Sequence, residues 1–197
     1  MDIQVLGNKT NPSVIVIGVI HGDEPQGEYL IKEYFKSHTN TALLMIPCLN
    51  KTGYEKGTRT NINGVDLNRN FPAKNWVEGD KGNYYGGGSP ASEEETRYVM
   101  SLVEKYNPKT ILTLHSPYKV VNYDGGGEEG KKLAEKISAI IGYPISDDIG
   151  YPTPGSFGTW AGIERNIPVI TLELSEDTAV KELKMPVFKI FEMLENY

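Results

Sequence analysis

Two histidines and a glutamate in this chain could bind a metal ion. His21 and Glu24 lie three residues apart, directly after a run of apolar residues, and His115 follows another such run far downstream. Two imidazoles and one carboxylate form a ligand set found in catalytic zinc sites, where a fourth position stays open. A histidine at a strand end can also be a core residue bonded to backbone, but two of the three histidines lie at such ends. We predict one zinc ion per chain, bound by His21, Glu24 and His115.

Glu173 could supply the base that such a site needs. It lies in the apolar segment 169–174, where a carboxylate is costly to bury unless it is paired or opens into a cleft. On an edge strand it could simply face water. In a cleft it could accept a proton from metal-bound water and later deliver it to a leaving amine, and this is the role we predict.

The long polar segment 50–91 contains donors suited to a carboxylate. Arg59, Asn68 and Arg69 could be surface groups of a polar loop. Near a metal ion they would instead suit a substrate carboxylate and the oxyanion that forms when its neighbouring amide is attacked. We predict that these three residues face the site.

Three further residues have simple alternative explanations. Asp66 could shape a turn, or it could accept a hydrogen bond from the free ring N–H of a ligand histidine. Tyr151 could be an ordinary loop aromatic. Cys48 lies in the apolar segment 43–49 and is predicted to be an inert thiol in a buried strand rather than a nucleophile.

The elements that must position these residues are strands alternating with helices. Helical spacing of apolar residues follows His21 as far as Phe35, and Ser92 with Glu95 is typical of a capping box that opens a helix to about Tyr106. Buried strands are predicted at 14–20, 42–49, 110–114 and 168–174, further helices at 129–141 and 178–195, and long loops at 50–91 and 142–158. Such alternation predicts an α/β fold with three layers, α/β/α, around a mostly parallel mixed sheet.

Composition restricts the class of protein further. The 197 residues suit a single domain, residues 1–197. With 20 basic and 26 acidic residues the net charge is −6, which argues against a nucleic-acid or anionic-membrane partner. One cysteine, no apolar run near the ~18 residues of a membrane span and no signal-peptide pattern predict a cytoplasmic protein. The oligomeric state stays open.

The candidate metal ligands resemble those of the zinc carboxypeptidase superfamily. That family combines His-x-x-Glu with a distant histidine, as in His21, Glu24 and His115, and its catalytic base falls on Glu173. The resemblance implies the zinc carboxypeptidase fold and a zinc-dependent hydrolase.

The same resemblance implies roles in substrate binding. The Asn-Arg pair that binds the terminal carboxylate of the family's substrates matches Asn68-Arg69 within the segment 64–72. The arginine that polarises the scissile carbonyl is similar to Arg59. The mobile tyrosine that covers bound substrate is similar to Tyr151, nine residues before Trp160.

Three segments resemble the murein peptide amidase A branch of this superfamily, at 70–79, 89–96 and 150–160. That branch implies hydrolysis of the γ-D-glutamyl–meso-diaminopimelate amide in cytoplasmic peptides recycled from the cell wall. One departure lies at 50–53, where this chain has Asn-Lys-Thr-Gly and the branch typically has Asn-Pro-Asp-Gly.

We therefore predict a zinc-dependent peptidase or amidase whose partner is a small peptide with a free carboxylate. One alternative is an N-acyl amino-acid deacylase of the aspartoacylase or succinylglutamate desuccinylase type, which would share the metal motif and the Asn-Arg pair. The segments 70–79 and 151–160 argue against it. The other alternative is a non-catalytic peptide-binding module, but neither a ligand nor the base is substituted here.

Overall fold

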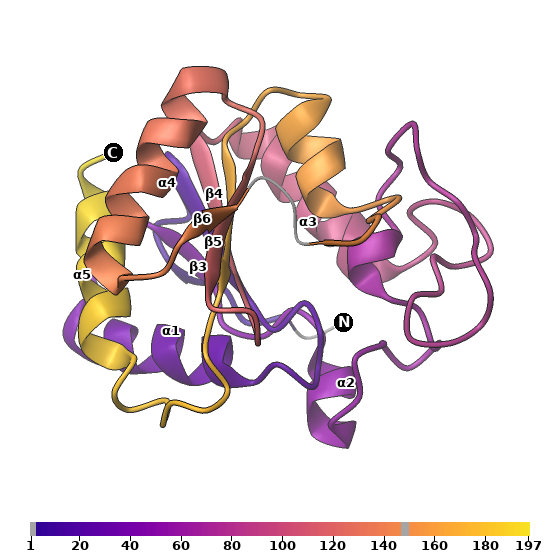
Figure 1. Ribbon diagram of the computed structural model, residues 1–197, viewed down its shortest axis with the longest axis horizontal. Helices are drawn as coiled ribbons and strands as arrows, with labels where there is room; N and C mark the ends of the chain where they lie inside the picture. Colours follow the sequence, from indigo (N-terminus) through magenta and orange to yellow (C-terminus); the bar gives the residue numbers. More distant parts are fainter. Residues whose placement is uncertain (1–2, 147–149) are drawn as a thin grey trace.

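The computed structural model describes residues 3–146 and 150–197, in which strands alternate with helices (Figure 1). The described strands are β1 Leu6–Gly7, β2 Val14–Gly18, β3 Leu44–Ile46, β4 Thr110–His115, β5 Val120–Asp124, β6 Ile145–Ser146 and β7 Val169–Glu173. The helices are α1 Gln26–Ser37, α2 Lys51–Lys56, α3 Glu94–Tyr106, α4 Gly127–Ile141 and α5 Lys184–Glu195, with a 3-10 turn, η1, at Leu67–Arg69 and a π-helical segment, η2, at Gly158–Ile163.

The strands form one mixed, mostly parallel sheet in the order β1-β3-β2-β4-β7-β5-β6. Neighbours are parallel except for β1 with β3 and β5 with β7. The carboxyl ends of β2, β4 and β7 therefore meet at the same edge, which is where open α/β sheets bind their ligands.

Both faces of the sheet are covered by helices. Successive side chains of a strand point to opposite faces, so each central strand contributes to both apolar layers. On β2, Val14 and Val16 pack with α1, α4 and α5, whereas Ile15 and Ile17 pack with α3 and η2. Figure 1 shows the sheet between these two helical layers. Each fully buried side chain of this kind contributes about 1.5–3 kcal/mol relative to an exposed one. The structure confirms the predicted three-layer α/β/α fold.

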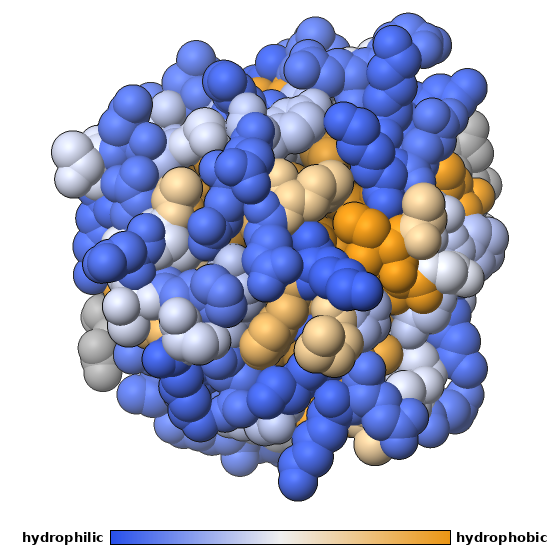
Figure 2. All heavy atoms as spheres, turned by 90° about the vertical axis from the view of Figure 1, so that its left-hand side faces the viewer, coloured by the Kyte–Doolittle hydropathy of each residue, from blue (hydrophilic) through white to orange (hydrophobic). Residues whose placement is uncertain are grey.

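The outer surface of the layer formed by α1, α4 and α5 is mostly hydrophilic (Figure 2). Each of these helices buries one stripe of apolar residues and leaves its polar side to solvent. Within the described ranges, no helix is long and apolar enough to cross a membrane.

The predicted capping box at the start of α3 is wrong. The helix begins at Glu94, and the residue before it, Glu93, makes no side-chain cap. The Ser92 hydroxyl instead donates to the Glu93 carboxylate at 2.6 Å and accepts from the Asn70 amide at 3.0 Å. A tertiary contact has therefore taken the hydroxyl that a box with Glu95 would need.

Several boundaries also differ from prediction. The strand predicted at 14–20 ends at Gly18, and the one predicted at 42–49 spans only Leu44–Ile46. The loops predicted at 50–91 and 142–158 contain α2 and β6, and β5 was not predicted. The last helix begins at Lys184 rather than at 178.

Cys48 lies two residues beyond the end of β3 and is partly exposed, so its predicted place in a buried strand is wrong. Burial nevertheless raises the pKa of its thiol to about 12. A thiol with such a pKa holds little thiolate at neutral pH and is a poor nucleophile.

Candidate metal centre and active-site cleft

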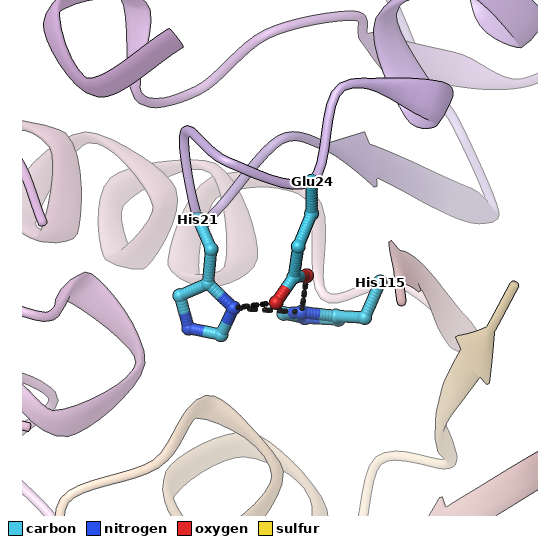
Figure 3. Close-up of side chains that lie close together, drawn as sticks. All are labelled: His21, Glu24 and His115. Carbon is cyan, nitrogen blue, oxygen red and sulfur yellow. Dashed lines mark hydrogen bonds and ion pairs between the residues drawn. The ribbon is translucent and has the colours of Figure 1, made fainter. Parts of the chain in front are cut away.

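The three candidate metal ligands lie together at the carboxyl edge of the sheet (Figure 3). His21 Nδ1 lies 2.7 Å from Glu24 Oε1, and His115 Nδ1 lies 2.8 Å from Glu24 Oε2. The two Nδ1 atoms are 3.2 Å apart. One donor atom from each residue lies within 4.8 Å of the others, so residues from two distant parts of the chain form one cluster.

A strained turn between β2 and α1 presents two of these ligands. Val19, directly after β2, has a φ of 51°, which is rare and costly for a β-branched residue. The Glu24 N–H then donates to the His21 carbonyl at 3.2 Å, so both side chains project from one short turn. Gly27 allows α1 to start close to the strand, because a Cβ there would lie 2.9 Å from Gly18 Cα.

The charges within the cluster compensate one another. Burial alone would lower the pKa of His21, but the carboxylates of Glu24 and Asp66 outweigh it and raise that pKa to about 9. Burial would raise the pKa of Glu24, but His21 and His115 hold it well below its usual range. The Glu24 carboxylate is thus kept anionic, and cation binding would release a proton from the His21 imidazole.

Asp66 connects the metal cluster to an arginine. Its carboxylate is fully buried and accepts from His21 Nε2 at 3.1 Å and from Arg59 Nε at 2.9 Å. It also accepts the Asn68 N–H at 2.8 Å, so it stabilises the turn at η1 as well. Burial opposes ionisation of Asp66, but the neighbouring cations hold its pKa well below the usual range. Such a carboxylate fixes the orientation of a metal-binding imidazole.

Glu173 is the last residue of β7 and lies beside His115 in the parallel register with β4. It is 5% exposed and lies on a strand between β4 and β5, so it is not an edge residue facing water. Its Oε2 has no hydrogen-bond partner among the described atoms. Burial raises the pKa of Glu173, although His115 opposes the shift. A buried carboxylate oxygen with no partner is well placed to accept a proton.

These residues border one cavity of about 240 Å³. His21, Glu24, His115 and Glu173 all line it. Two imidazole nitrogens and a carboxylate on one side of a cleft, with the other side open, fit the donor set of a catalytic zinc ion.

The predicted carboxylate-binding pair lines the same cavity from η1. Asn68 Oδ1 accepts the Phe157 N–H at 2.9 Å, and no described residue accepts a hydrogen bond from the Asn68 side-chain NH2. Arg69 is buried, and its Nη1 donates to the Asn68 carbonyl at 2.8 Å. Its guanidinium carbon lies 5.6 Å from the ring centre of Tyr84 and 5.8 Å from that of Tyr151. Together they present N–H donors suited to a carboxylate.

Tyr151 lies between two other cavity-lining tyrosines, at ring-centre distances of 6.2 Å from Tyr84 and 6.4 Å from Tyr118. Burial raises the pKa of Tyr151 to about 12, so its hydroxyl stays protonated. Tyr84 and Tyr118 were not among the predicted site residues. Tyr118 follows His115 by three residues, which was the available signal, whereas Tyr84 lies in a long loop without any periodic pattern.

The segment 50–53, which departs from the related branch, forms the start of α2 beside the metal cluster. Asn50 is fully buried, accepts the Gly53 N–H at 2.9 Å and donates to the carbonyls of Ile20 and Arg59 at 3.3 and 3.1 Å. Gly53 lies against Gly22, where a Cβ would be 2.0 Å from the Gly53 carbonyl carbon. The two shared residues, Asn50 and Gly53, are buried, and the departure falls on Lys51 and Thr52 between them, which are more exposed.

Comparison with known proteins defines the class of this chain. A zinc carboxypeptidase family model matches residues 3–192. The chain belongs to the zinc carboxypeptidase family and is a hydrolase.

Three relatives illustrate the similarity. Murein peptide amidase A from Escherichia coli strain K12 is 32% identical over 184 residues, covering 85% of this chain and 74% of that protein. The crystal structure of murein-tripeptide amidase from Escherichia coli O157 is similar with a TM-score of 0.81 and 26% identity, over 96% of this chain and 83% of that one. Gamma-D-glutamyl-L-diamino acid endopeptidase 1 from Lysinibacillus sphaericus is 30% identical over 134 residues, covering 62% of this chain and 33% of that protein.

Proposed function

We propose that this protein is a zinc-dependent amidase that hydrolyses the amide before a residue with a free carboxylate, in peptides derived from murein. The observation that carries the proposal is the meeting of His21, Glu24 and His115 with the unpaired carboxylate oxygen of Glu173 in one cavity. A ligand set alone would serve storage or structure, whereas a ligand set beside a buried base serves hydrolysis.

His21, Glu24 and His115 would hold the zinc ion, which would supply a Lewis acid able to polarise a carbonyl and acidify water. Glu173 accepts a proton from the attacking water at Oε2 and later donates it to the nitrogen of the leaving amine. The raised pKa of Glu173 suits both halves of this task, because a very weak base could not take the proton and a very strong one would not return it.

Arg59 donates to the oxyanion that forms on the scissile carbonyl. Its Nε is fixed by Asp66, and its Nη1 lies 3.5 Å from Glu24 Oε1, so the guanidinium is oriented before substrate arrives. Donors that need no reorganisation stabilise the transition state most effectively. Asn68 and Arg69 bind the free carboxylate of the substrate, and Tyr151 covers it.

The finer assignment is the γ-D-glutamyl–meso-diaminopimelate amide. It is supported by the similarity to murein peptide amidase A and to a gamma-D-glutamyl-L-diamino acid endopeptidase. A substrate of this kind, released from the wall and taken up by the cell, agrees with the cytoplasmic location predicted from the sequence.

A product assay tests the proposal. Purified protein with one equivalent of zinc is incubated with L-Ala-γ-D-Glu-meso-diaminopimelate, with and without a chelator, and the products are identified by mass spectrometry. Release of free diaminopimelate that the chelator abolishes is the expected result. Absence of release by protein that has bound zinc would overturn the assigned linkage, and N-acetyl and N-succinyl amino acids would then distinguish the deacylase alternative.

A further inference from the structure

The ring of Tyr84 lies against the two arginines that line the cavity. Its centre is 5.1 Å from the guanidinium carbon of Arg59 and 5.6 Å from that of Arg69. All three residues border the same cavity as the metal cluster. A cation is attracted to the face of an aromatic ring within about 6 Å of its centre. One ring therefore contacts both guanidiniums that the cleft presents to an anionic substrate.

The buried guanidinium of Arg69 has no carboxylate partner among the described residues, whereas Arg59 forms ion pairs with two carboxylates. Arg69 Nη1 donates to the Asn68 carbonyl at 2.8 Å, and the rings of Tyr84 and Tyr151 lie beside the guanidinium. A buried cation is unfavourable unless it is compensated. An aromatic ring compensates it without occupying its N–H groups, whereas a protein carboxylate would compete for them with the carboxylate of a substrate.

Burial does not explain the position of Tyr84. The residue is 59% exposed, so its placement removes little apolar surface from water. Its side chain contacts the two guanidiniums and the ring of Tyr151, whose centre is 6.2 Å away. These contacts use the aromatic ring of Tyr84 and not its hydroxyl. The ring is therefore the part of the side chain to which a role can be assigned.

The backbone directly after Tyr84 is anchored to the segment that carries Asp66 and the η1 turn. The Tyr85 carbonyl accepts the Asp66 N–H at 2.9 Å, and the Gly86 carbonyl accepts from the Asn70 side chain at 2.7 Å. The loop that carries Tyr84 is thus tied to the loop that carries the arginines. These hydrogen bonds hold the ring beside the guanidiniums although the side chain is largely exposed.

We propose that Tyr84 is a positioning residue that holds the guanidiniums of Arg59 and Arg69 with their N–H groups directed at the substrate. The inference rests on the proposed function, in which Arg59 donates to the oxyanion and Arg69 binds the free carboxylate. These two anionic groups lie on either side of the same amide, so the two guanidiniums must be oriented together. A shared ring orients both without adding a negative charge, which would weaken the attraction of the cleft for an anion.

Substitutions of the ring test this inference. Tyr84→Leu removes the aromatic face and keeps an apolar side chain, whereas Tyr84→Phe keeps the ring. With L-Ala-γ-D-Glu-meso-diaminopimelate we expect Tyr84→Leu to lower kcat/KM by about 10- to 30-fold, through a higher KM and a lower kcat, and Tyr84→Phe to retain most of the activity. Tyr85→Leu is the matched control from the same loop, because the Tyr85 hydroxyl contacts Glu78 instead, at 3.4 Å.

Binding provides a readout that does not need turnover. Each variant is made in zinc-loaded Glu173→Gln protein and titrated by calorimetry with this tripeptide and with the same peptide whose carboxylate next to the scissile amide is a carboxamide. We expect the preference for the free carboxylate to fall by about 10-fold in Tyr84→Leu and to persist in Tyr84→Phe and Tyr85→Leu.

Three results would overturn the inference: an equal loss of preference in both Tyr84 variants, an unchanged preference in Tyr84→Leu, or no preference in protein that retains Tyr84. Absence of cleavage by the wild-type protein, with a preference that depends on the ring, would count against the proposed linkage and not against Tyr84.

Discussion

The cleft has two ends that differ in how their buried carboxylates are neutralised: the upper end is the metal cluster, and the lower end is the part of the cavity lined by Asp124. At the upper end, His21, Glu24 and Asp66 lie in a network in which carboxylates contact histidines or Arg59 at 2.7 to 3.5 Å. At the lower end, Asp124 has burial without a cationic partner among the described residues. Glu24 and Asp66 are thus neutralised within the protein, whereas no described cation neutralises Asp124.

This difference separates groups that are oriented in advance by their partners from a carboxylate that no described cation orients. Groups that stabilise a transition state work best when they are oriented in advance, since no reorganisation is then needed during the reaction. A group that selects a substrate can instead gain its partner from that substrate, and a competitor without the partner leaves it unsatisfied. The predictions below act on one end or the other.

The largest effect is expected from removing a metal ligand. His115→Ala takes away one of three donors, so the zinc content of the purified protein should fall well below one per chain and turnover by ~10⁴-fold or more. His38→Ala is the matched control, because His38 lies at the end of α1, stacked on Tyr34 at 4.0 Å. Elemental analysis and the product assay measure both variants. Full zinc content and turnover in the His115 variant would remove it from the metal centre.

A smaller effect at the same end is expected from Asp66→Asn. The change keeps the shape of the side chain but weakens its contacts with His21 Nε2 and Arg59 Nε. Loss of such a carboxylate costs about 10- to 100-fold in metal affinity or activity. A competition titration with a zinc indicator measures the affinity, and an unchanged value together with unchanged turnover would limit Asp66 to its role in the η1 turn.

The smallest effect concerns the stability contributed by the lower end. The pKa of Asp124 is raised from 3.8 to about 6 in the folded protein, so the folded state binds this proton more tightly than the unfolded state. The contribution of protonated Asp124 to the free energy of unfolding is therefore fully present below about pH 3.8 and is lost as pH rises through about 6. Asp124→Asn should stabilise metal-free protein by about 2 kcal/mol at pH 7.5 and by almost nothing at pH 4.

Urea unfolding at both pH values measures this gain, and Asp177→Asn provides the control for loss of an exposed carboxylate. Equal stabilisation by Asp124→Asn at the two pH values would show that burial of charge is not what distinguishes Asp124.

The upper end of the cleft could be predicted from sequence and the lower end could not. Strands β2, β4 and β7 are apolar and rich in β-branched residues, and the candidate metal ligands and base lie at or near their carboxyl ends. β5 has the mixed sequence Val-Val-Asn-Tyr-Asp followed by glycines, which is equally typical of a turn. Asp124 is placed only by the antiparallel register of that strand with β7.

The remaining differences in the fold have similar causes. α2 has six residues, including a glycine, and no apolar periodicity; Asn50 caps its start by accepting the Gly53 N–H and also donates to the carbonyls of Ile20 and Arg59. Ser92 and Glu95 have the residue types and spacing of a capping box, so the wrong prediction followed the local sequence. The Ser92 hydroxyl instead accepts a hydrogen bond from Asn70, more than twenty positions earlier in the chain. The contact between Ser92 and Asn70 is set by the tertiary structure and leaves no local pattern in the sequence.

The central claim is that Glu173 performs the proton transfers at a metal centre built by other residues. The most direct measurement compares zinc content and release of free diaminopimelate for wild-type and Glu173→Gln protein under identical conditions. We predict one zinc per chain in both proteins and a loss of turnover of ~10⁴-fold or more in the variant alone. Turnover near the wild-type level in zinc-loaded Glu173→Gln protein would contradict the account.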